Sequence, residues 1–264
     1  MLRSAMKMQP KLFALGMGGF DRPLPTMLRA MGWDLCAIAF HFKVAHPGRF
    51  LRNIAALRRN PGRRLLADLA ALSGVGWVAI HTLQLLSRRP ISREIMVEEV
   101  TSFGPWADDL WETHRSRYLI IGSRESSTLN VLYPSGKGFI CLKVTRGTKV
   151  LGWIVLLDTR MKNNKYFGDM RVGSIVDCFA APENANVVLQ AGTQALERRG
   201  VDLIVSNQGH KAWTSGLRAN GFLSASSNFI FAASNPVAEL ISPFESNKSD
   251  FFFNRGDGDG PVNL

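Results

Sequence analysis

Cysteine is scarce in this sequence, which has only three among 264 residues: Cys36, Cys141 and Cys178. Their count is odd and they lie far apart, so the pattern excludes both a disulfide framework and a cysteine-ligated zinc site. Cys36 and Cys178 stand in apolar runs, where a thiol is expected to pack as a small core side chain. This usage is typical of a reducing compartment and favours a cytoplasmic location.

Long uninterrupted apolar runs are also missing. Polar residues and a proline at positions 7–11 interrupt the N-terminal segment, so we expect no secretory signal there. One long apolar stretch, residues 65–86, contains Asp68, His81 and Gln84. Because a charge in mid-span costs roughly 2.5–3.5 kcal/mol, this stretch predicts a helix lying against protein or on a membrane surface, not a span.

Acidic residues are nearly absent from residues 43–93, where many Arg and Lys accompany a single acid, Asp68. The whole chain has a net charge of +11. Such an excess favours anionic partners, either cofactor phosphates, lipid headgroups or nucleic acid, and composition does not choose among them. We expect residues 47–94 to form a basic helical linker that contacts a membrane surface peripherally through residues 47–93. No specific nucleic-acid partner is predicted.

A short internal repeat links the two ends of the chain. Leu28–Trp33 and Leu217–Phe222 share the pattern Leu-Arg-Ala-x-Gly-aromatic, and 40–42 match 229–231 at the same offset. Each copy predicts a strand, a short helix that ends at a glycine able to adopt the left-handed conformation, and a second strand. The match is either chance similarity of one strand–helix–strand unit or the mark of two related domain ends. In the second case, residues 1–46 are a partial module that has lost its front.

The order of predicted elements over residues 95–233 indicates a mixed-sheet α/β (α+β) domain. Strands are expected at 95–100, 140–146, 150–158, 173–180, 201–206 and 227–233, and helices at 105–117, 126–133, 184–199 and 210–219. The N-terminal unit is expected to place a helix, 23–31, between strands 11–16 and 35–44. Residues 234–264, rich in Pro, Ser, Asn and Gly, are expected to run over the surface.

Three segments of residues 95–233 resemble the GNAT acyltransferases. They are the hairpin 143–158, the strand Val172–Phe179 with the long helix after it, and the strand Val201–Asn207 followed by a short helix ending in Gly-Phe. Two such modules in one chain are similar to the tandem layout of Fem-type aminoacyl transferases and of acyltransferases found with polysaccharide or envelope biosynthesis. The likeness covers one module at 95–233 and part of another at 11–44.

The resemblance implies an acyl-CoA donor, acetyl-CoA or another acyl-CoA, whose pantetheine inserts between two splayed parallel strands, here 173–180 and 201–207. The residues implied to bind this cofactor are Cys178, Phe179, Ala180 and Asn184. The pyrophosphate would lie on N–H groups at the start of the next helix. In place of the family's Gln/Arg-x-x-Gly-x-Gly/Ala signature, residues 180–188 have no glycine and include Glu183. Fem-type proteins also depart from this signature, because their donor is an aminoacyl-tRNA.

Three polar residues near these strands are the candidate catalytic residues. Asp177 lies within an apolar strand, where a charge needs either a structural partner or a site. Asn207 ends the next strand, where ligands collect in α/β sheets, and would bind a donor or acceptor amide or else cap the following helix. His210 is either a general base, since its ordinary pKa is near 6.5, or a solvated first-turn residue.

Two further polar segments bear on ligands. The loop after the strand 150–158 either recognises an anionic acceptor or is an ordinary solvated loop; its basic residues are Arg160, Lys162, Lys165 and Arg171. Residues 255–261 alternate Gly and Asp in a manner that suggests calcium. An EF-hand loop spans 12 residues and closes on Glu, so we expect no metal site.

These patterns predict an acyltransferase that moves an acyl or aminoacyl group to an amine or sugar-linked acceptor, a small molecule or saccharide, in envelope or polysaccharide metabolism. Catalysis would consist of proximity and deprotonation of the acceptor. Two alternatives stay open. One is a non-catalytic binding module or inactive fragment of a tandem protein, and the other is a protein that associates with a membrane surface or nucleic acid through residues 43–93.

Overall fold

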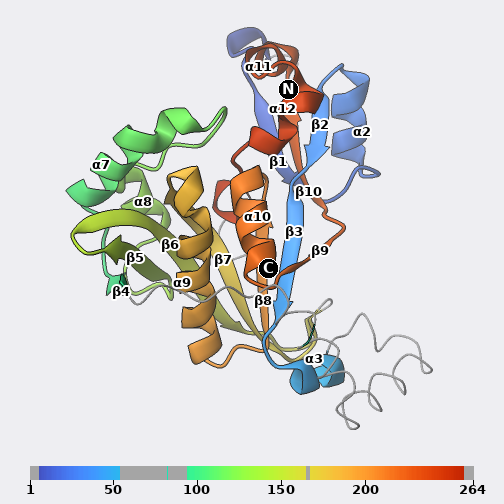
Figure 1. Ribbon diagram of the computed structural model, residues 1–264. Coiled ribbons are helices and arrows are strands. Elements are labelled where there is room, and N and C mark those ends of the chain that lie inside the picture. Colours follow the sequence, from blue (N-terminus) through green and yellow to red (C-terminus); the bar gives the residue numbers. More distant parts are fainter. Residues whose placement is uncertain (1–5, 54–81, 83–93, 165–166, 259–264) are drawn as a thin grey trace.

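A computed structural model of the protein describes residues 6–53, 82, 94–164 and 167–258 (Figure 1). Its larger sheet is built from β3 (Ala39–Val44), β4 (Ile95–Val100), β5 (Ile140–Arg146), β6 (Lys149–Arg160), β7 (Arg171–Ala180), β8 (Leu203–Gln208) and β9 (Leu223–Ala225). The strand order is β4-β5-β6-β7-β8-β3-β9. Among these pairs only β7 and β8 run parallel, so the mixed α/β sheet predicted from the sequence is confirmed.

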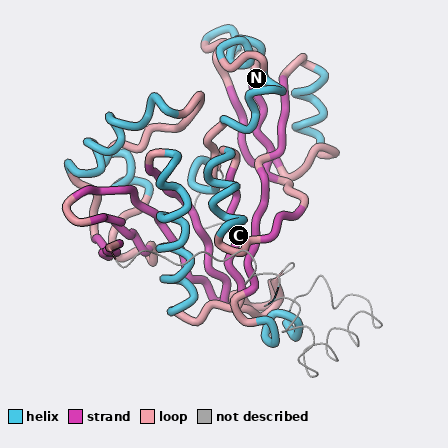
Figure 2. The backbone as a smooth tube through the Cα atoms, viewed as in Figure 1, coloured by secondary structure: helices cyan, strands magenta, loops and turns pink. Residues whose placement is uncertain are grey.

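A smaller antiparallel sheet contains β1 (Phe13–Met17), β2 (Asp34–Ala37) and β10 (Phe229–Ala233), in the order β1-β10-β2. Figure 2 shows its strands beside the N-terminus, above one edge of the larger sheet. The first two strands and the last strand of the described chain therefore share one sheet, although more than 180 residues separate β2 from β10 in sequence.

The two sheets exchange strands. β3 follows β2 in the chain but lies between β8 and β9, whereas β10 follows β9 but lies between β1 and β2. Each repeat copy thus contributes its last strand to the sheet of the other copy. The single strand expected at 35–44 is therefore wrong, because the backbone leaves one sheet at Ile38 and enters the other.

The repeated helices end in the same way. Both α2 (Pro23–Ala30) and α10 (Lys211–Ala219) are followed by a glycine in the left-handed conformation, Gly32 with φ 81° and Gly221 with φ 82°. The aromatic residue after each glycine donates its N–H to the carbonyl of Leu28 or Leu217, at 3.1 Å in both copies. This is the Schellman ending, and it confirms the helix ends predicted from the repeat.

Helices cover both faces of the larger sheet. The helix α9 (Ala185–Arg198) packs so closely on β6 that a Cβ on Gly192 would lie 2.5 Å from Ile154 Cδ1. On the opposite face α7 (Pro105–His114) brings Trp111 to 5.2 Å from Phe179, ring to ring. Two short helices complete the central part of the chain: α3 (Pro47–Asn53) and α8 (Ser126–Leu132). The main hydrophobic core lies between these layers.

The C-terminal segment differs from the surface tail expected at 234–264. It forms α11 (Asn235–Leu240) and α12 (Phe244–Asn247) and then buries residues 251–254 completely or almost completely. Three successive phenylalanines, Phe251 to Phe253, supply the reason, since each removes a large apolar area from water.

Most of the expected basic linker lies outside the described residues, as does the apolar stretch 65–86 apart from Thr82. Of the linker, the structure describes α3, Thr82 and Glu94. No helix in the described part of the chain is long and apolar enough to cross a membrane.

Candidate functional site

The parallel strands β7 and β8 diverge halfway along their length. Their paired residues run from Val172 with Leu203 to Ile175 with Ser206, and the pairing ends there. At the same level β7 carries a bulge against β6, because Ile175 pairs with Leu156 while Asp177 pairs with Val155. A bulge bends its strand and increases the local twist, which accounts for the separation of the two strand ends.

The protein's own C-terminal segment lies in this gap. Gln208 of β8 forms an isolated bridge with Asn254, and Gly209 donates its N–H to the Phe253 carbonyl at 3.0 Å. A Cβ on Gly209 would lie 2.6 Å from the Phe251 carbonyl oxygen, so this approach requires glycine. On the other side Phe252 donates its N–H to the Ile120 carbonyl at 2.9 Å.

Phe252 is the apolar anchor of the segment. Its ring is fully buried and makes edge contacts with Tyr118 and Trp213, at centroid distances of 4.8 and 5.7 Å. The guanidinium of Arg124 lies over the same ring at 4.8 Å. A desolvated cation over an aromatic face is attractive, so the anchor joins apolar packing to the charged cluster beside it.

Asp177 is the centre of that buried cluster. Its Oδ1 accepts hydrogen bonds from Arg124 Nε at 3.1 Å and Asn254 Nδ2 at 2.6 Å, and its Oδ2 accepts one from Tyr133 at 2.8 Å. Arg124 also binds both carboxylate oxygens of Asp257, at 2.9 and 2.8 Å. Both members of the Asp177–Arg124 pair are only 2% exposed.

The cluster holds Asp177 as a paired acid in this structure. Burial and the adjacent Asp177 carboxylate raise the pKa of Tyr133, so its hydroxyl stays a donor. Burial opposes the charge on Arg124, but the carboxylates of Asp177 and Asp257 outweigh it and raise the guanidinium pKa. Fully satisfied charges of this kind are costly to disrupt, so the cluster fixes the C-terminal segment in the gap.

His210 caps α10 and is not solvated. Its Nδ1 accepts the N–H of Ala212 at 3.2 Å, which places the ring proton on Nε2. The ring is buried against Tyr118, and burial lowers the pKa of His210 to about 4. Neutral His210 with Nδ1 occupied has no lone pair available to act as a base in this arrangement.

Asn207 also contacts the C-terminal segment. Its Oδ1 accepts a hydrogen bond from Arg255 Nη1 at 3.4 Å, and its Nδ2 donates to Ser227 Oγ at 3.4 Å. The sequence left open that Asn207 caps the following helix, but in the structure His210 caps it. Asn207 and Asp177 thus lie on opposite sides of the gap, each bonded to the same C-terminal segment.

The residues that the GNAT resemblance implies for cofactor binding lie at the end of β7 and in the turn after it. Cys178 Sγ accepts a hydrogen bond from Gln208 Nε2 across the gap at 3.4 Å. The carbonyl of Ala180 accepts the Tyr118 hydroxyl at 2.7 Å, and Phe179 packs against the same tyrosine ring. The backbone edge that a bound cofactor would use is therefore partly occupied by Tyr118.

The start of α9 is also occupied. Asn184 donates its N–H to the Ala181 carbonyl at 2.8 Å, and its side chain does not cap the helix. Glu183 forms an exposed ion pair with Arg117 at 3.2 Å. A Cβ on Gly216 of α10 would lie 3.3 Å from the Asn186 nitrogen, so α10 packs tightly on the first turn of α9.

Sequence reasoning missed four members of the buried cluster: Arg124, Tyr133, Asn254 and Asp257. One signal was present, because an acid within the apolar strand β7 requires a buried cation somewhere in the chain. A second was the run Phe251–Phe253, which favours a buried position for the polar residues that follow it. Neither signal identifies the partner, because the contacts join residues 44 to 133 positions apart.

No family model matches the sequence, and no curated protein matches it either. Among solved structures, the chain is similar to a GCN5-related N-acetyltransferase from Anabaena variabilis (10% identity, TM-score 0.47, covering 87% of this chain and 47% of that one). It is also similar to a probable N-acyltransferase from Enterococcus faecalis (9%, 0.48, 92% and 50%). A third similar structure is the N-myristoyltransferase of Saccharomyces cerevisiae with bound myristoyl-CoA and inhibitors (10%, 0.44, 81% and 56%). The chain spans about half of each of these proteins, and similarity this low carries no substrate or reaction over to it.

Proposed function

We propose that the gap between β7 and β8 is an acyl-donor cleft, and that the protein is an acyl or aminoacyl transferase. The observation that carries this proposal is the loss of pairing beyond Ile175 and Ser206, next to a bulge in β7. Two parallel strands that separate in mid-sheet expose unpaired backbone groups, which need a partner. An extended pantetheine arm would supply one, and the C-terminal segment supplies it in this structure.

The proposal requires the C-terminal segment to be a replaceable occupant of the cleft. Asn254 covers Asp177, Arg255 covers Asn207, and both contacts would be released if the segment moved. Gln208 Oε1 is buried in the same region without a hydrogen-bond partner among the described residues. An acceptor oxygen left unsatisfied at this position suits an amide N–H of a donor. Transfer would then rest on proximity to a small-molecule or saccharide acceptor.

A second candidate function is a non-catalytic module, and one observation favours it. The segment in the gap is fixed by a buried ion-pair cluster, not by loose surface contacts. In that case the C-terminal segment fills the cleft permanently, and the protein is a binding module with no catalytic role. Peripheral membrane contact through residues 47–93 and a cytoplasmic location remain part of either proposal.

Calorimetric titration with acetyl-CoA and CoA separates the two candidates. The variant Asp257→Asn removes one charge from the Arg124 clamp while Asp177 still neutralises the arginine. We expect acetyl-CoA to bind the wild-type chain weakly and this variant several-fold more tightly, because the C-terminal segment yields more readily. Absence of binding by both folded proteins would leave the non-catalytic module, or a donor other than acyl-CoA.

A further inference from the structure

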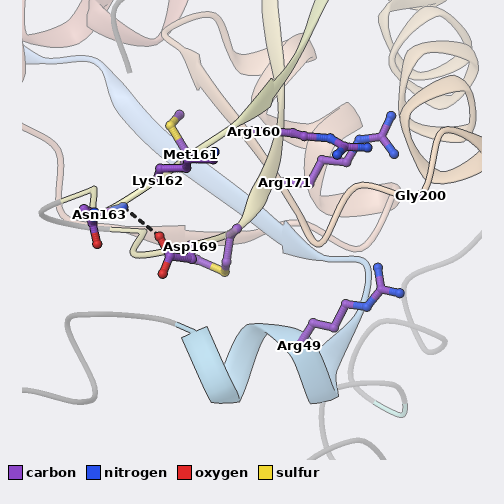
Figure 3. A pocket seen from close by; sticks show the side chains of 9 residues that line it. Arg49, Arg160, Met161, Lys162, Asn163, Asp169, Arg171 and Gly200 are labelled. Carbon is purple, nitrogen blue, oxygen red and sulfur yellow. Dashed lines mark hydrogen bonds between the residues drawn. The ribbon is translucent and has the colours of Figure 1, made fainter.

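A second region of the molecule, outside the proposed cleft, is a hollow of about 620 Å³ at the other end of the β7–β8 pair (Figure 3). The charged residues that line it are Arg49, Arg160, Lys162, Asp169 and Arg171. The volume is within the range typical of small-molecule sites, about 300–1,000 Å³. It lies where β7 begins, whereas the cleft lies where β7 ends.

Three separate segments bring cations to this hollow. Arg49 comes from α3, Arg160 and Lys162 from the end of β6 and the turn after it, and Arg171 from the first position of β7. Four cations and one acid, Asp169, give the lining a formal charge of +3. Figure 3 shows Arg49 approaching from α3 and the Arg160 and Arg171 side chains close to each other on the opposite side.

The acids near the hollow are already engaged. Asp169 accepts the N–H of Asn163 at 2.7 Å, and Asp158 forms a two-point pair with Arg171, at 2.8 and 2.6 Å. Asp202 accepts the Arg171 backbone N–H at 3.0 Å and the guanidinium of Arg49 at 3.5 Å. Arg171 is therefore held in one orientation before any ligand arrives, which lowers the entropic cost of binding.

Arg160 and Lys162 are different from Arg171. Within the described residues neither has a carboxylate within 4 Å, so their charges are not neutralised by that part of the chain. Such surplus positive charge, next to a preorganised arginine, favours an anion with several oxygen acceptors. Phosphate groups fit this description best, because guanidinium groups bind their oxygens in pairs.

We infer that this hollow binds a phosphate-bearing molecule, with Arg160 and Lys162 as the main contacts and Arg171 and Arg49 on the two sides. The inference is independent of the proposed transferase function, because the hollow lies at the start of β7 and the gap lies beyond Ile175 and Ser206. It gives the basic loop after β6 a role that the sequence left open between anion recognition and simple solvation. Of that loop, Lys165 lies outside the described residues.

The test is a calorimetric titration of the full chain with inorganic pyrophosphate at low salt. We expect saturable binding that weakens steeply as salt rises and falls about tenfold in Arg160→Ala/Lys162→Ala. The matched control is Arg146→Ala/Lys149→Ala, which removes an exposed arginine and lysine from the β5–β6 turn. The inference fails if wild-type protein shows no saturable binding, or if the control weakens binding as much as the hollow variant does.

Vesicles distinguish the source of the phosphate. A lipid headgroup is indicated if phosphatidylglycerol vesicles bind, pyrophosphate competes, and Arg160→Ala/Lys162→Ala reduces the binding. A soluble phosphate compound is indicated if pyrophosphate binds as expected and vesicle binding does not respond to this variant. Thermal melting of each variant checks that the fold is intact, and acetyl-CoA titration of the same variants keeps this site separate from the cleft.

Discussion

The two ends of the β7–β8 pair place arginine in opposite environments. At the diverging end Arg124 is 2% exposed and bonded to two carboxylates, with Phe252 packed beneath it. At the other end Arg160 and Lys162 line an open hollow and have no carboxylate partner in the described part of the chain. A buried charge must be satisfied from within the protein, whereas an exposed one keeps its capacity for a ligand. The comparison teaches that the protein's own residues close the first end, whereas the second end is open to a ligand as it stands.

Breaking the buried end has the largest expected effect. Arg124→Met leaves the carboxylates of Asp177 and Asp257 buried without a cation, so the free energy of unfolding should fall by about 3–5 kcal/mol. Urea denaturation followed by circular dichroism measures this. The control is Arg171→Met, whose ion pair with Asp158 is partly exposed, so its loss should lower the free energy of unfolding much less than the loss of Arg124. Equal losses in the two variants would contradict the comparison.

Removing the aromatic anchor tests the same end through packing. Phe252→Ala deletes a fully buried ring, and we expect a loss of about 3 kcal/mol in the free energy of unfolding. The matched variant Phe20→Ala removes a ring that is 37% exposed and should cost under about 1 kcal/mol. If Phe252→Ala were as mild as Phe20→Ala, the C-terminal segment would not occupy the gap in solution.

Lowering the pH should reduce the stability that His210 contributes at the diverging end, whereas the arginine and lysine side chains of the hollow keep their charge. Burial lowers the pKa of His210 to about 4, below its unfolded value near 6.5. The unfolded chain therefore binds more protons between these values, so the stability from this ring is present above pH 6.5 and is lost toward pH 4. The loss is about 2 kcal/mol for this group by pH 4.5.

The variant His210→Asn isolates this contribution, because asparagine can cap α10 but does not titrate in this range. Urea unfolding at pH 7 and at pH 4.5 should show a smaller loss in the variant than in the wild type. His41, buried with a pKa lowered by burial to about 4, contributes in both proteins and cancels in the comparison. An identical pH dependence in the two proteins would refute the prediction.

Variants of the hollow should have the smallest effect on stability. Arg160→Ala/Lys162→Ala removes exposed charges with no ion-pair partner in the described chain, so the free energy of unfolding should change by less than about 0.5 kcal/mol. Urea denaturation alongside Arg124→Met checks it. A loss of several kcal/mol would mean that these side chains support the fold, and the contrast between the two ends would disappear.

The sequence predicted the elements that rest on local signals. The spacing of hydrophobic residues predicted the positions of β4 to β8 and of α7 to α10 to within a few residues. The glycine after each repeated helix predicted both Schellman endings. The exchange of β3 and β10 was not predicted, because strand partners depend on contacts between distant residues. The resemblance to splayed GNAT strands did lead to the gap between β7 and β8.

The sequence patterns did not predict that the C-terminal segment occupies this gap. Composition placed residues 234–264 on the surface, yet three phenylalanines carry the chain back to Asp177. The roles of Asp177 and His210 were left open between function and structure for the same reason. A side chain's partners decide which role it takes, and Arg124 and Asn254 lie 53 and 77 residues away from Asp177 in sequence.

Hydrogen–deuterium exchange with and without acetyl-CoA tests the central claim most directly, namely that the gap is a donor cleft filled by a replaceable segment. The amides to follow are Phe252, bonded to Ile120, and Gly209, bonded to Phe253. The account predicts that saturating acetyl-CoA speeds exchange over residues 251–257 and slows it at the diverging end of β7. Unchanged exchange at both places, with the segment as protected as the strands beside it, would contradict the account.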